Sequence, residues 1–523
     1  MNFRLMIVCS VLIGPSMMIC GMTRGETISV VTVDASNTHP ISPFIYGANY
    51  PDWKRMNVPF TLARQGGNRL TAYNWKNNAS NAGADWHHQN DDYLGRIDEA
   101  GWTVRSFLEE AQRHQAATIL TVQTIGHVAA DKNPPGDVNL SPNYLKTRFV
   151  PSYARKPGAN YTYPPDSKDH AVYQDEQVWW IEKIKSPAAP VWYMLDNEPD
   201  LWSATHARLQ TNKLGYAEII ANSLEYGCAV KAVAPKALVF GPANYGWEGF
   251  QSFQDAPDAK GRNFLDVYLE AMKQEEKRQG KRILDVLDIH WYPEAKGGGV
   301  RVTENAEGNA PLDTARIQAP RSLWDPGYVE ESWIAQSLGK RPIQLLPSLI
   351  AKIDAHYPGT KLSISEYNFG GGTHPSGLIA QADVLGIFGR YGVFAACNWG
   401  VSSKDAAMLA GFRAYLDYDA HGGRFGSLGL EVTRKSPALN SFYASLDSFD
   451  GKKMTVVAIN KTDKDQHFKL KTEHFLPKRV RAFTFKEGFY QQPVISDPMI
   501  AKGGEGVTVS LPPYSVTTVA LEQ

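Results

Sequence analysis

Two glutamates in polar and aromatic surroundings have the residue type and setting for acid–base and nucleophilic chemistry. Glu198 lies within Leu195-Asp-Asn-Glu-Pro199, and Glu366 lies within Ile364-Ser-Glu-Tyr-Asn368. Each ends a short apolar run that is typical of a buried strand. Hydrolysis of a glycosidic bond requires two such carboxyls, one to protonate the leaving oxygen and one to attack or to activate water. A single glutamate of this kind is more often a structural ion-pair partner, but two on suitable strands favour the catalytic interpretation.

Three other polar residues at strand ends could assist the two glutamates. Asn197 precedes Glu198, and Asn-Glu-Pro at such a position is typical of the acid/base residue of retaining barrel glycosidases, with the amide donating to a sugar 2-hydroxyl. Arg69 could keep Glu366 ionised and oriented as a nucleophile, although it could equally belong to a structural ion pair. Tyr292 could donate a hydrogen bond to Glu366 or form the wall of a sugar subsite. We rank His290 below these three residues as a catalytic candidate and expect it to be a core histidine.

Metal and serine chemistry find less support in the sequence. His87 and His88 are adjacent, which is not a chelating spacing, and neither an H-E-x-x-H nor a paired C-x-x-C motif is present. A G-x-S-x-G nucleophile elbow is also missing. We therefore expect no catalytic metal and no required cofactor, while loop carboxylates and carbonyls leave room for a structural calcium ion.

The elements that must position these residues alternate between apolar runs and amphipathic segments. Most of the eight runs are continuous rather than alternating in apolar residues, as strands buried on both faces should be. The runs are 44–49, 62–69, 116–124, 191–197, 237–244, 284–292, 361–367 and 393–399. Helical patterns cover 97–115, 213–234, 263–279, 333–356 and 379–391. The pattern predicts an α/β fold, a (β/α)₈ TIM barrel whose active site lies at the carboxyl ends of its strands. A doubly wound open sheet is the competitor, but no glycine-rich phosphate loop follows the first run.

A smaller C-terminal antiparallel β-sandwich domain is expected after the barrel. Short alternating strands bounded by turn residues occupy 454–461, 467–471, 479–485, 506–511 and 515–521. The run 27–34 has the same character and could pair with that sheet. We therefore divide the chain into a signal peptide (1–25), an N-terminal strand (26–43), the catalytic barrel (44–430) and the sandwich (431–523).

Composition limits the partners and the compartment. Lys plus Arg and Asp plus Glu both number 54, so no net field attracts nucleic acid or an anionic membrane, and a neutral substrate fits best. Arg4 followed by a short apolar run interrupted at Gly14 predicts a cleaved secretory signal, hence an extracellular or periplasmic protein. Cys20 lacks a good lipoprotein box, so we expect a released protein rather than a lipid-anchored one. We also expect a monomer. Cys228 and Cys397 remain in the mature chain and are expected to be free thiols.

Several motifs together resemble glycoside hydrolase family 44. The longest is Gly66-Gly-Asn-Arg-Leu-Thr-Ala-Tyr-Asn-Trp-Lys-Asn-Asn-Ala-Ser-Asn-Ala-Gly-Ala-Asp-Trp86, and the segments around Glu198 and Glu366 also match. Arg321-Ser-Leu-Trp-Asp-Pro326 and Asn398-Trp-Gly400 extend the resemblance over the whole barrel. The likeness implies a barrel with a β-sandwich and retaining, endo-acting hydrolysis of β-1,4-glucans and xyloglucan. It also implies that Glu198 is the acid/base and Glu366 the nucleophile.

The same resemblance suggests which side chains bind the polysaccharide. Trp75, Trp324, Trp333 and Trp399 are expected to be subsite platforms, and Asn68 a further substrate-binding residue. The alternatives that stay open are a hemicellulase acting on mannan or xylan, and a non-catalytic barrel that only binds polysaccharide.

Overall fold

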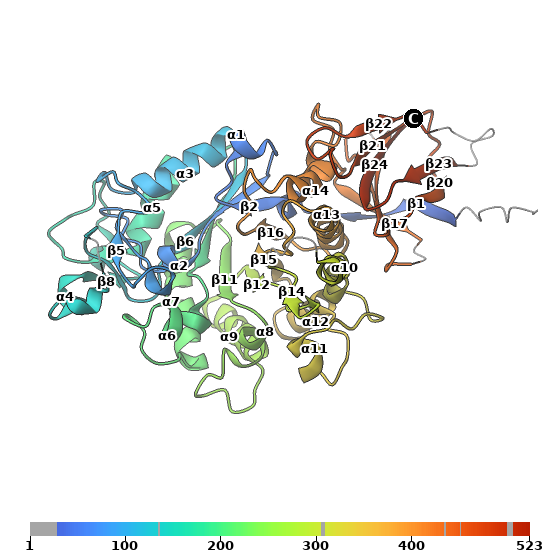
Figure 1. The fold of residues 1–523 in the computed structure, drawn as a ribbon. Coiled ribbons are helices and arrows are strands. Elements are labelled where there is room, and N and C mark those ends of the chain that lie inside the picture. The colour runs from blue at the N-terminus through green and yellow to red at the C-terminus, as the bar shows by residue number, and fades with distance from the viewer. Residues whose placement is uncertain (1–28, 134–135, 305–308, 434–435, 450, 499–505) are drawn as a thin grey trace, which may run out of the picture.

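The computed structural model describes residues 29–133, 136–304, 309–433, 436–449, 451–498 and 506–523. The predicted signal peptide lies outside these residues. Two domains lie side by side, a barrel and a smaller β domain formed by the C-terminal strands together with the N-terminal strand (Figure 1). Within the described residues, none of the helices has both the length and the apolar character needed to span a bilayer.

The barrel closes from eight parallel strands in the order β10-β11-β12-β15-β16-β2-β3-β6. All eight predicted runs contain one of them: β2 Gly47–Asn49, β3 Leu62–Gln65, β6 Ala117–Val122, β10 Val191–Leu195, β11 Val239–Asn244, β12 Val286–Trp291, β15 Lys361–Tyr367 and β16 Ala395–Asn398. The closed sheet of eight parallel strands confirms the predicted (β/α)₈ barrel. The carboxyl ends of all eight strands therefore meet at one mouth.

Strand alternation decides which side chains enter the barrel. Leu62 packs with Ile119 and Phe240 inside the barrel, whereas Ala63 belongs to the core between the strands and the outer helices. Because side chains on a strand alternate between its two faces, Arg64 points inward above Leu62. Its side chain is fully buried.

The outer ring consists of helices that follow the strands: α3 Trp102–Arg113, α5 Gln174–Ile184, α7 Tyr216–Val233, α9 Phe264–Gln279, α10 Ala310–Gln318, α12 Leu345–His356, α13 Pro375–Arg390 and α14 Ala406–Leu416. Short helices occupy the loops: α1 Trp53–Met56, α2 Asn68–Thr71, α4 Tyr144–Thr147, α6 Trp202–Thr205, α8 Trp247–Ser252 and α11 Trp333–Ser337. The single helix predicted over 333–356 is wrong, because the chain turns at Gly339 (φ 71°) between α11 and α12. The loops also carry the small strands β4 Ser80–Asn81, β5 Asn90–Asp91, β7 His127–Ala129, β8 Phe149–Tyr153, β9 Val172–Tyr173, β13 Lys296–Gly297 and β14 Val300–Arg301.

Nine strands form the smaller domain, in the order β22-β21-β24-β19-β18-β17-β1-β20-β23. They are β1 Ser29–Pro40, β17 Leu428–Val432, β18 Asn440–Leu446, β19 Lys453–Asn460, β20 Gln466–Glu473, β21 Arg479–Phe485, β22 Val494–Ser496, β23 Val507–Leu511 and β24 Ser515–Glu522. The N-terminal strand β1 pairs antiparallel with β17 and parallel with β20, so the two ends of the chain share one sheet. These strands enclose their own apolar core, which includes Val33, Met454 and Leu521. This arrangement agrees with the predicted antiparallel sandwich.

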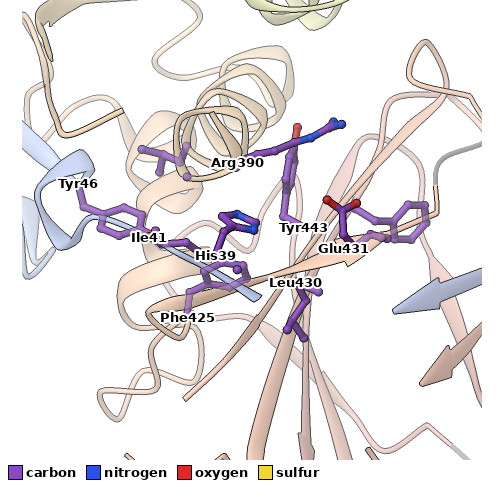
Figure 2. Close-up of a pocket in the computed structure, with 15 residues that line it drawn as sticks. His39, Ile41, Tyr46, Arg390, Phe425, Leu430, Glu431 and Tyr443 are labelled. Carbon is purple, nitrogen blue, oxygen red and sulfur yellow. The ribbon is translucent and has the colours of Figure 1, made fainter. Parts of the chain in front are cut away.

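The seam between the two domains is tightly packed. Val457 and Phe485 of the sheet belong to the same apolar cluster as Leu385 of α13 and Phe412 of α14. The cavity shown in Figure 2 lies at this seam, between Arg390 of the barrel and Glu431 of the sheet. Its volume is only about 30 Å³, about the share of one water molecule, so it cannot admit a sugar.

Candidate active site

The two glutamates meet at the mouth of the barrel. Glu198 follows β10 and Glu366 lies near the end of β15, and both are largely buried, with 8% and 4% of their surface exposed. One oxygen of each carboxyl and one nitrogen of His290 all lie within 4.8 Å of one another. Both side chains line a cavity of about 380 Å³ that opens to solvent. The sequence prediction that these carboxyls face one another is confirmed.

Glu366 is held by two hydrogen-bond donors. Nη1 of Arg64 donates to Oε1 at 2.6 Å, and the hydroxyl of Tyr292 donates to Oε2 at 2.8 Å. These two donors, one charged and one neutral, fix the orientation of the carboxyl group. For the arginine itself, burial opposes the charge, but Glu366 and Asp288 outweigh it and raise the pKa of Arg64. The predicted contact of Tyr292 with Glu366 is present.

The environment of Glu198 favours the protonated form. Burial raises the pKa of Glu198 to about 8, the nearby charge of Asp85 adds to this rise, and Arg64 opposes it. Its side-chain partner is Nδ1 of His290, 2.8 Å from Oε1. Burial lowers the pKa of His290 to about 3, so this imidazole is neutral near pH 7. The two carboxyls therefore have different partners, a guanidinium for Glu366 and a neutral imidazole for Glu198, as suits a nucleophile and an acid in one site.

The backbone around Glu198 is bent to present its side chain. Glu198 has φ 44° and ψ 54°, in the left-handed region that non-glycine residues rarely adopt. Its N–H donates to the carbonyl of Ala243 at 3.0 Å, which holds this conformation against the neighbouring strand. Each residue held in this backbone conformation lowers the stability of the fold by about 1–3 kcal/mol, and such residues cluster at functional sites.

Asn197 is held by its side-chain oxygen. Oδ1 accepts from Nη2 of Arg64 at 2.7 Å and from the backbone N–H of Gly67 at 3.1 Å. Nη1 of the same arginine also bonds Oδ1 of Asn49 at 3.0 Å. Arg64 thus links both catalytic strands through one buried side chain. The neighbouring Asn68 lines the cavity, as predicted for a substrate-binding residue.

The prediction that Arg69 contacts Glu366 is wrong. Strand β3 ends at Gln65, and Arg69 lies in the short helix α2, where Nη1 is 2.6 Å from both carboxylate oxygens of Asp91. The contact belongs to Arg64, five residues earlier, which lies within β3 and projects into the barrel on the same face as Leu62. A charged residue inside the predicted strand was the signal in the sequence.

The structure places the four predicted tryptophan platforms in different environments. Trp399 lines the cavity, and a Cβ on Gly67 (φ 89°) would come within 2.5 Å of its ring, so a glycine is required there. Trp75 is wrong as a platform, because it is fully buried and stacks on Trp180 at 5.7 Å. Trp333 is 40% exposed at the start of α11 and stays a prediction.

Trp324 is also wrong as a platform. Its ring lies beside the guanidinium of Arg390, 5.2 Å away. Arg390 ends α13, which runs back from the mouth, and the chain then enters β16 from its amino end. Trp324 is therefore located at the end of the barrel opposite the carboxylates.

Sequence reasoning missed or undervalued further residues of the cavity. His290, which we ranked as a core histidine, bridges towards both carboxyls, with Nδ1 3.4 Å from Oε2 of Glu366. Asp85, Tyr245 and Arg301 complete the lining. The signal for His290 was its place two residues before Tyr292, which directly follows the strand, so that both side chains can point to the barrel mouth.

Glu198, His290 and Glu366 are also, among the described residues, the one group of ligand-type side chains close enough to share a metal ion. A cation already faces this group, because Nη1 of Arg64 is 2.6 Å from Oε1 of Glu366. The positive charge that a metal would bring is thus supplied by the guanidinium. The donor set fits an acid–nucleophile pair better than a metal centre.

A parallel barrel with two carboxyls at its mouth, one beside a guanidinium and one beside a neutral imidazole, defines a glycoside hydrolase of the TIM-barrel type. Comparison with known proteins agrees: residues 79–295 match the model of glycoside hydrolase family 44. The chain is 38% identical to a family 44 endoglucanase from Clostridium thermocellum, covering 94% of this chain and 99% of that structure with a TM-score of 0.88. A family 44 xyloglucanase from Paenibacillus polymyxa, solved with xyloglucan, shares 34% identity over the same proportions, also with a TM-score of 0.88.

The chain belongs to glycoside hydrolase family 44. Endoglucanase A of Paenibacillus lautus is 41% identical over 445 residues, which cover 81% of this chain but 62% of that protein. The chain therefore spans less than two thirds of the length of this curated relative.

Proposed function

We propose that this protein is a secreted, retaining, endo-acting hydrolase of β-1,4-glucosidic bonds in cellulose-like glucans and xyloglucan. The observation that carries the proposal is the pair of carboxyls whose oxygens lie within 4.8 Å, one beside an arginine and one beside a neutral histidine. A short separation suits double displacement, whereas inverting enzymes keep their carboxyls about 6.5–9.5 Å apart to admit a water molecule. The related endoglucanases and the xyloglucanase support this choice of substrate.

In the first step of this mechanism, Glu366 attacks the anomeric carbon while protonated Glu198 donates its proton to the leaving glycosidic oxygen. The products are a glycosyl ester on Glu366 and a free sugar hydroxyl. In the second step, ionised Glu198 removes a proton from water, which attacks the anomeric carbon and releases Glu366. The two inversions give net retention. Proton and nucleophile both come from the carboxyls, so the proposed reaction requires no cofactor.

Asn197 is suited to a supporting role in this reaction. Because Arg64 and Gly67 occupy its side-chain oxygen, the amide is oriented with Nδ2 as its remaining polar group. The contact from Nδ2 to Oδ1 of Asn68 is 3.5 Å long, so this donor has capacity for a substrate hydroxyl. A hydrogen bond to the 2-hydroxyl would strengthen as charge develops in the transition state.

Product analysis tests the proposal. The protein would be incubated with carboxymethylcellulose, xyloglucan, mannan and xylan, and the newly formed reducing ends followed by anomer-resolved NMR. We expect β-anomers to appear first on the glucan and xyloglucan, with a rapid fall in viscosity that indicates cleavage within the chain. Initial α-anomers would establish inversion, faster cleavage of mannan or xylan would make the protein a hemicellulase, and binding without product would make it a non-catalytic barrel. Secretion, a monomeric state and a structural calcium ion stay predictions.

A further inference from the structure

A second cavity adjoins the catalytic one on the side of the loop between α2 and α3. Its volume is about 1020 Å³, and residues 85–97 supply most of its lining, together with Arg69 and Trp102. Asp85 lines both this cavity and the catalytic one, so the two hollows adjoin at that residue. None of the tryptophans expected to be platforms lies here, and the mechanism above does not use this space.

Two aromatic side chains of the second cavity are unusually exposed. Trp86 is 56% exposed and Tyr93 is 73% exposed, although large aromatic residues are normally mostly buried. The guanidinium of Arg69 stacks on one face of the Tyr93 ring, 4.2 Å from its centre, which restrains this ring. Exposed rings restrained beside a cavity are suited to the apolar C–H faces of sugar rings.

The polar groups of the second cavity are paired in a way that suits an uncharged ligand. Arg69 and Asp91 neutralise one another, and Asp91 is held further by the hydroxyl of Ser80 at 3.0 Å and the backbone N–H of Tyr93 at 3.2 Å. Both hydrogen bonds of Arg69 come from Nη1, so Nε and Nη2 are left to donate to a ligand. Hydroxyl groups fit these donors without the cost of burying an unpaired charge.

We propose that this second cavity binds the continuation of the same neutral β-linked glucan chain that is cut between Glu198 and Glu366, with Trp86 and Tyr93 as its sugar platforms. The inference rests on the proposed function, since it extends that substrate along the surface. It assigns to these two residues a role in selecting long chains over short ones. Arg69, which does not reach the nucleophile, instead positions Tyr93 and offers donors to the bound chain.

The test compares the wild-type protein with Trp86→Ala, Tyr93→Ala and the double variant. The quantity measured is the ratio of kcat/KM for cellohexaose to kcat/KM for an activated aryl cellobioside, which has only two sugar rings. We expect the ratio to fall about tenfold in each single variant and further in the double variant. Phe449→Ala is the matched control, because Phe449 is 95% exposed on the β domain and its loss should leave the ratio unchanged.

Each outcome distinguishes this inference from the proposed function. A ratio that stays at the wild-type value in the double variant would overturn the second binding site while leaving the catalytic assignment intact. An equal loss on both substrates would also overturn it, because the residues would then act on the reaction or the fold rather than on chain length. If the wild-type protein cleaves neither substrate, the proposed function itself fails. Binding of cellohexaose to Glu366→Gln with and without Trp86→Ala, measured by calorimetry, gives a readout independent of turnover, and equal affinities would contradict the inference.

Discussion

The mouth of the barrel and the seam between the domains both bury a carboxylate beside a cation, yet they differ in what surrounds the pair. At the mouth, Arg64 and Glu366 are 2.6 Å apart with side chains 0% and 6% exposed. At the seam, Lys461 and Asp383 are 2.7 Å apart and each 1% exposed. Burial and ion pairing alone therefore do not distinguish a catalytic carboxylate from a structural one.

The seam satisfies its charges completely. The hydroxyl of Tyr443 donates to Oδ1 of Asp383 at 2.7 Å, while Nζ of Lys461 bonds Oδ2 and also the carbonyl of Pro437 at 3.0 Å. The neighbouring cavity in Figure 2 has room for about one water. At the mouth, the second carboxyl, Glu198, is paired with a neutral imidazole and faces a cavity of about 380 Å³. Two carboxyls with unlike partners beside open space, rather than a buried charge, therefore mark the chemistry.

The largest loss of activity is expected for Glu366→Gln, at the mouth of the barrel. The amide retains the shape of the side chain but cannot attack the anomeric carbon, so kcat on carboxymethylcellulose should fall by roughly 10⁴-fold or more. A thermal melt within a few degrees of the wild type would show that the fold persists. Wild-type activity in this variant would remove Glu366 from the role of nucleophile.

Glu198→Ala should lose less activity on a substrate with a good leaving group. On the polysaccharide the rate should drop about 10²–10⁴-fold, because the leaving alcohol needs a proton. On an activated aryl glycoside the first step needs no acid, and added azide should restore part of the rate by replacing the activated water. Steady-state kinetics with and without azide measure this, and no recovery at any azide concentration would contradict the acid/base role.

Asp383→Asn tests the ion pair at the seam between the domains. Loss of the carboxylate leaves Lys461 buried without its counter-ion, which should lower the free energy of unfolding by about 3–5 kcal/mol, while kcat of the folded protein stays at the wild-type value. Denaturant unfolding and steady-state kinetics measure the two quantities. The double variant Asp383→Asn, Lys461→Met removes both charges and should recover part of the stability. A marked loss of kcat in the folded single variant would mean that the seam also serves the chemistry.

The smallest effect concerns the pH dependence. Glu198 must carry its proton in the first step and has a pKa of about 8, so kcat/KM should fall about tenfold per pH unit above pH 8 and lose nothing through this group below it. The charge of Asp85 raises that pKa. Asp85→Asn should therefore move the alkaline limb to lower pH, by less than about one unit. Asp92→Asn is the control, and a limb that moves upward in Asp85→Asn would contradict the electrostatic account.

Much of the fold could be predicted because it depends on patterns that the sequence shows directly. Continuous apolar runs identified all eight barrel strands, and residues at their ends identified Glu198, Glu366 and Tyr292. Arg64 was missed because a run buried on both faces hides which residues point inward, and the predicted strand was extended to 69 although it ends at Gln65. Trp75 shows the same limit, because a tryptophan among Asn residues resembles a surface platform until its stacking on Trp180 is seen.

The surroundings of the two glutamates could be predicted only in part. The need for one acid and one nucleophile follows from the reaction, but the contact of Arg64 with Glu366 and the burial that raises the pKa of Glu198 depend on the closed barrel. The partner of Glu198 likewise depends on the strand register, because His290 lies on the inward face of β12. Contacts between residues distant in sequence decide these features.

The central claim is that Glu366 is the nucleophile and Glu198 the acid/base, and covalent trapping tests it most directly. A 2-deoxy-2-fluoro cellobioside with an activated leaving group should glycosylate the protein, while the fluorine slows release of the sugar enough for peptide mass spectrometry. The account predicts one added fluorosugar on the peptide that contains Glu366, and none in Glu366→Gln. A label on Glu198, or turnover with inversion and no label on either residue, would contradict it.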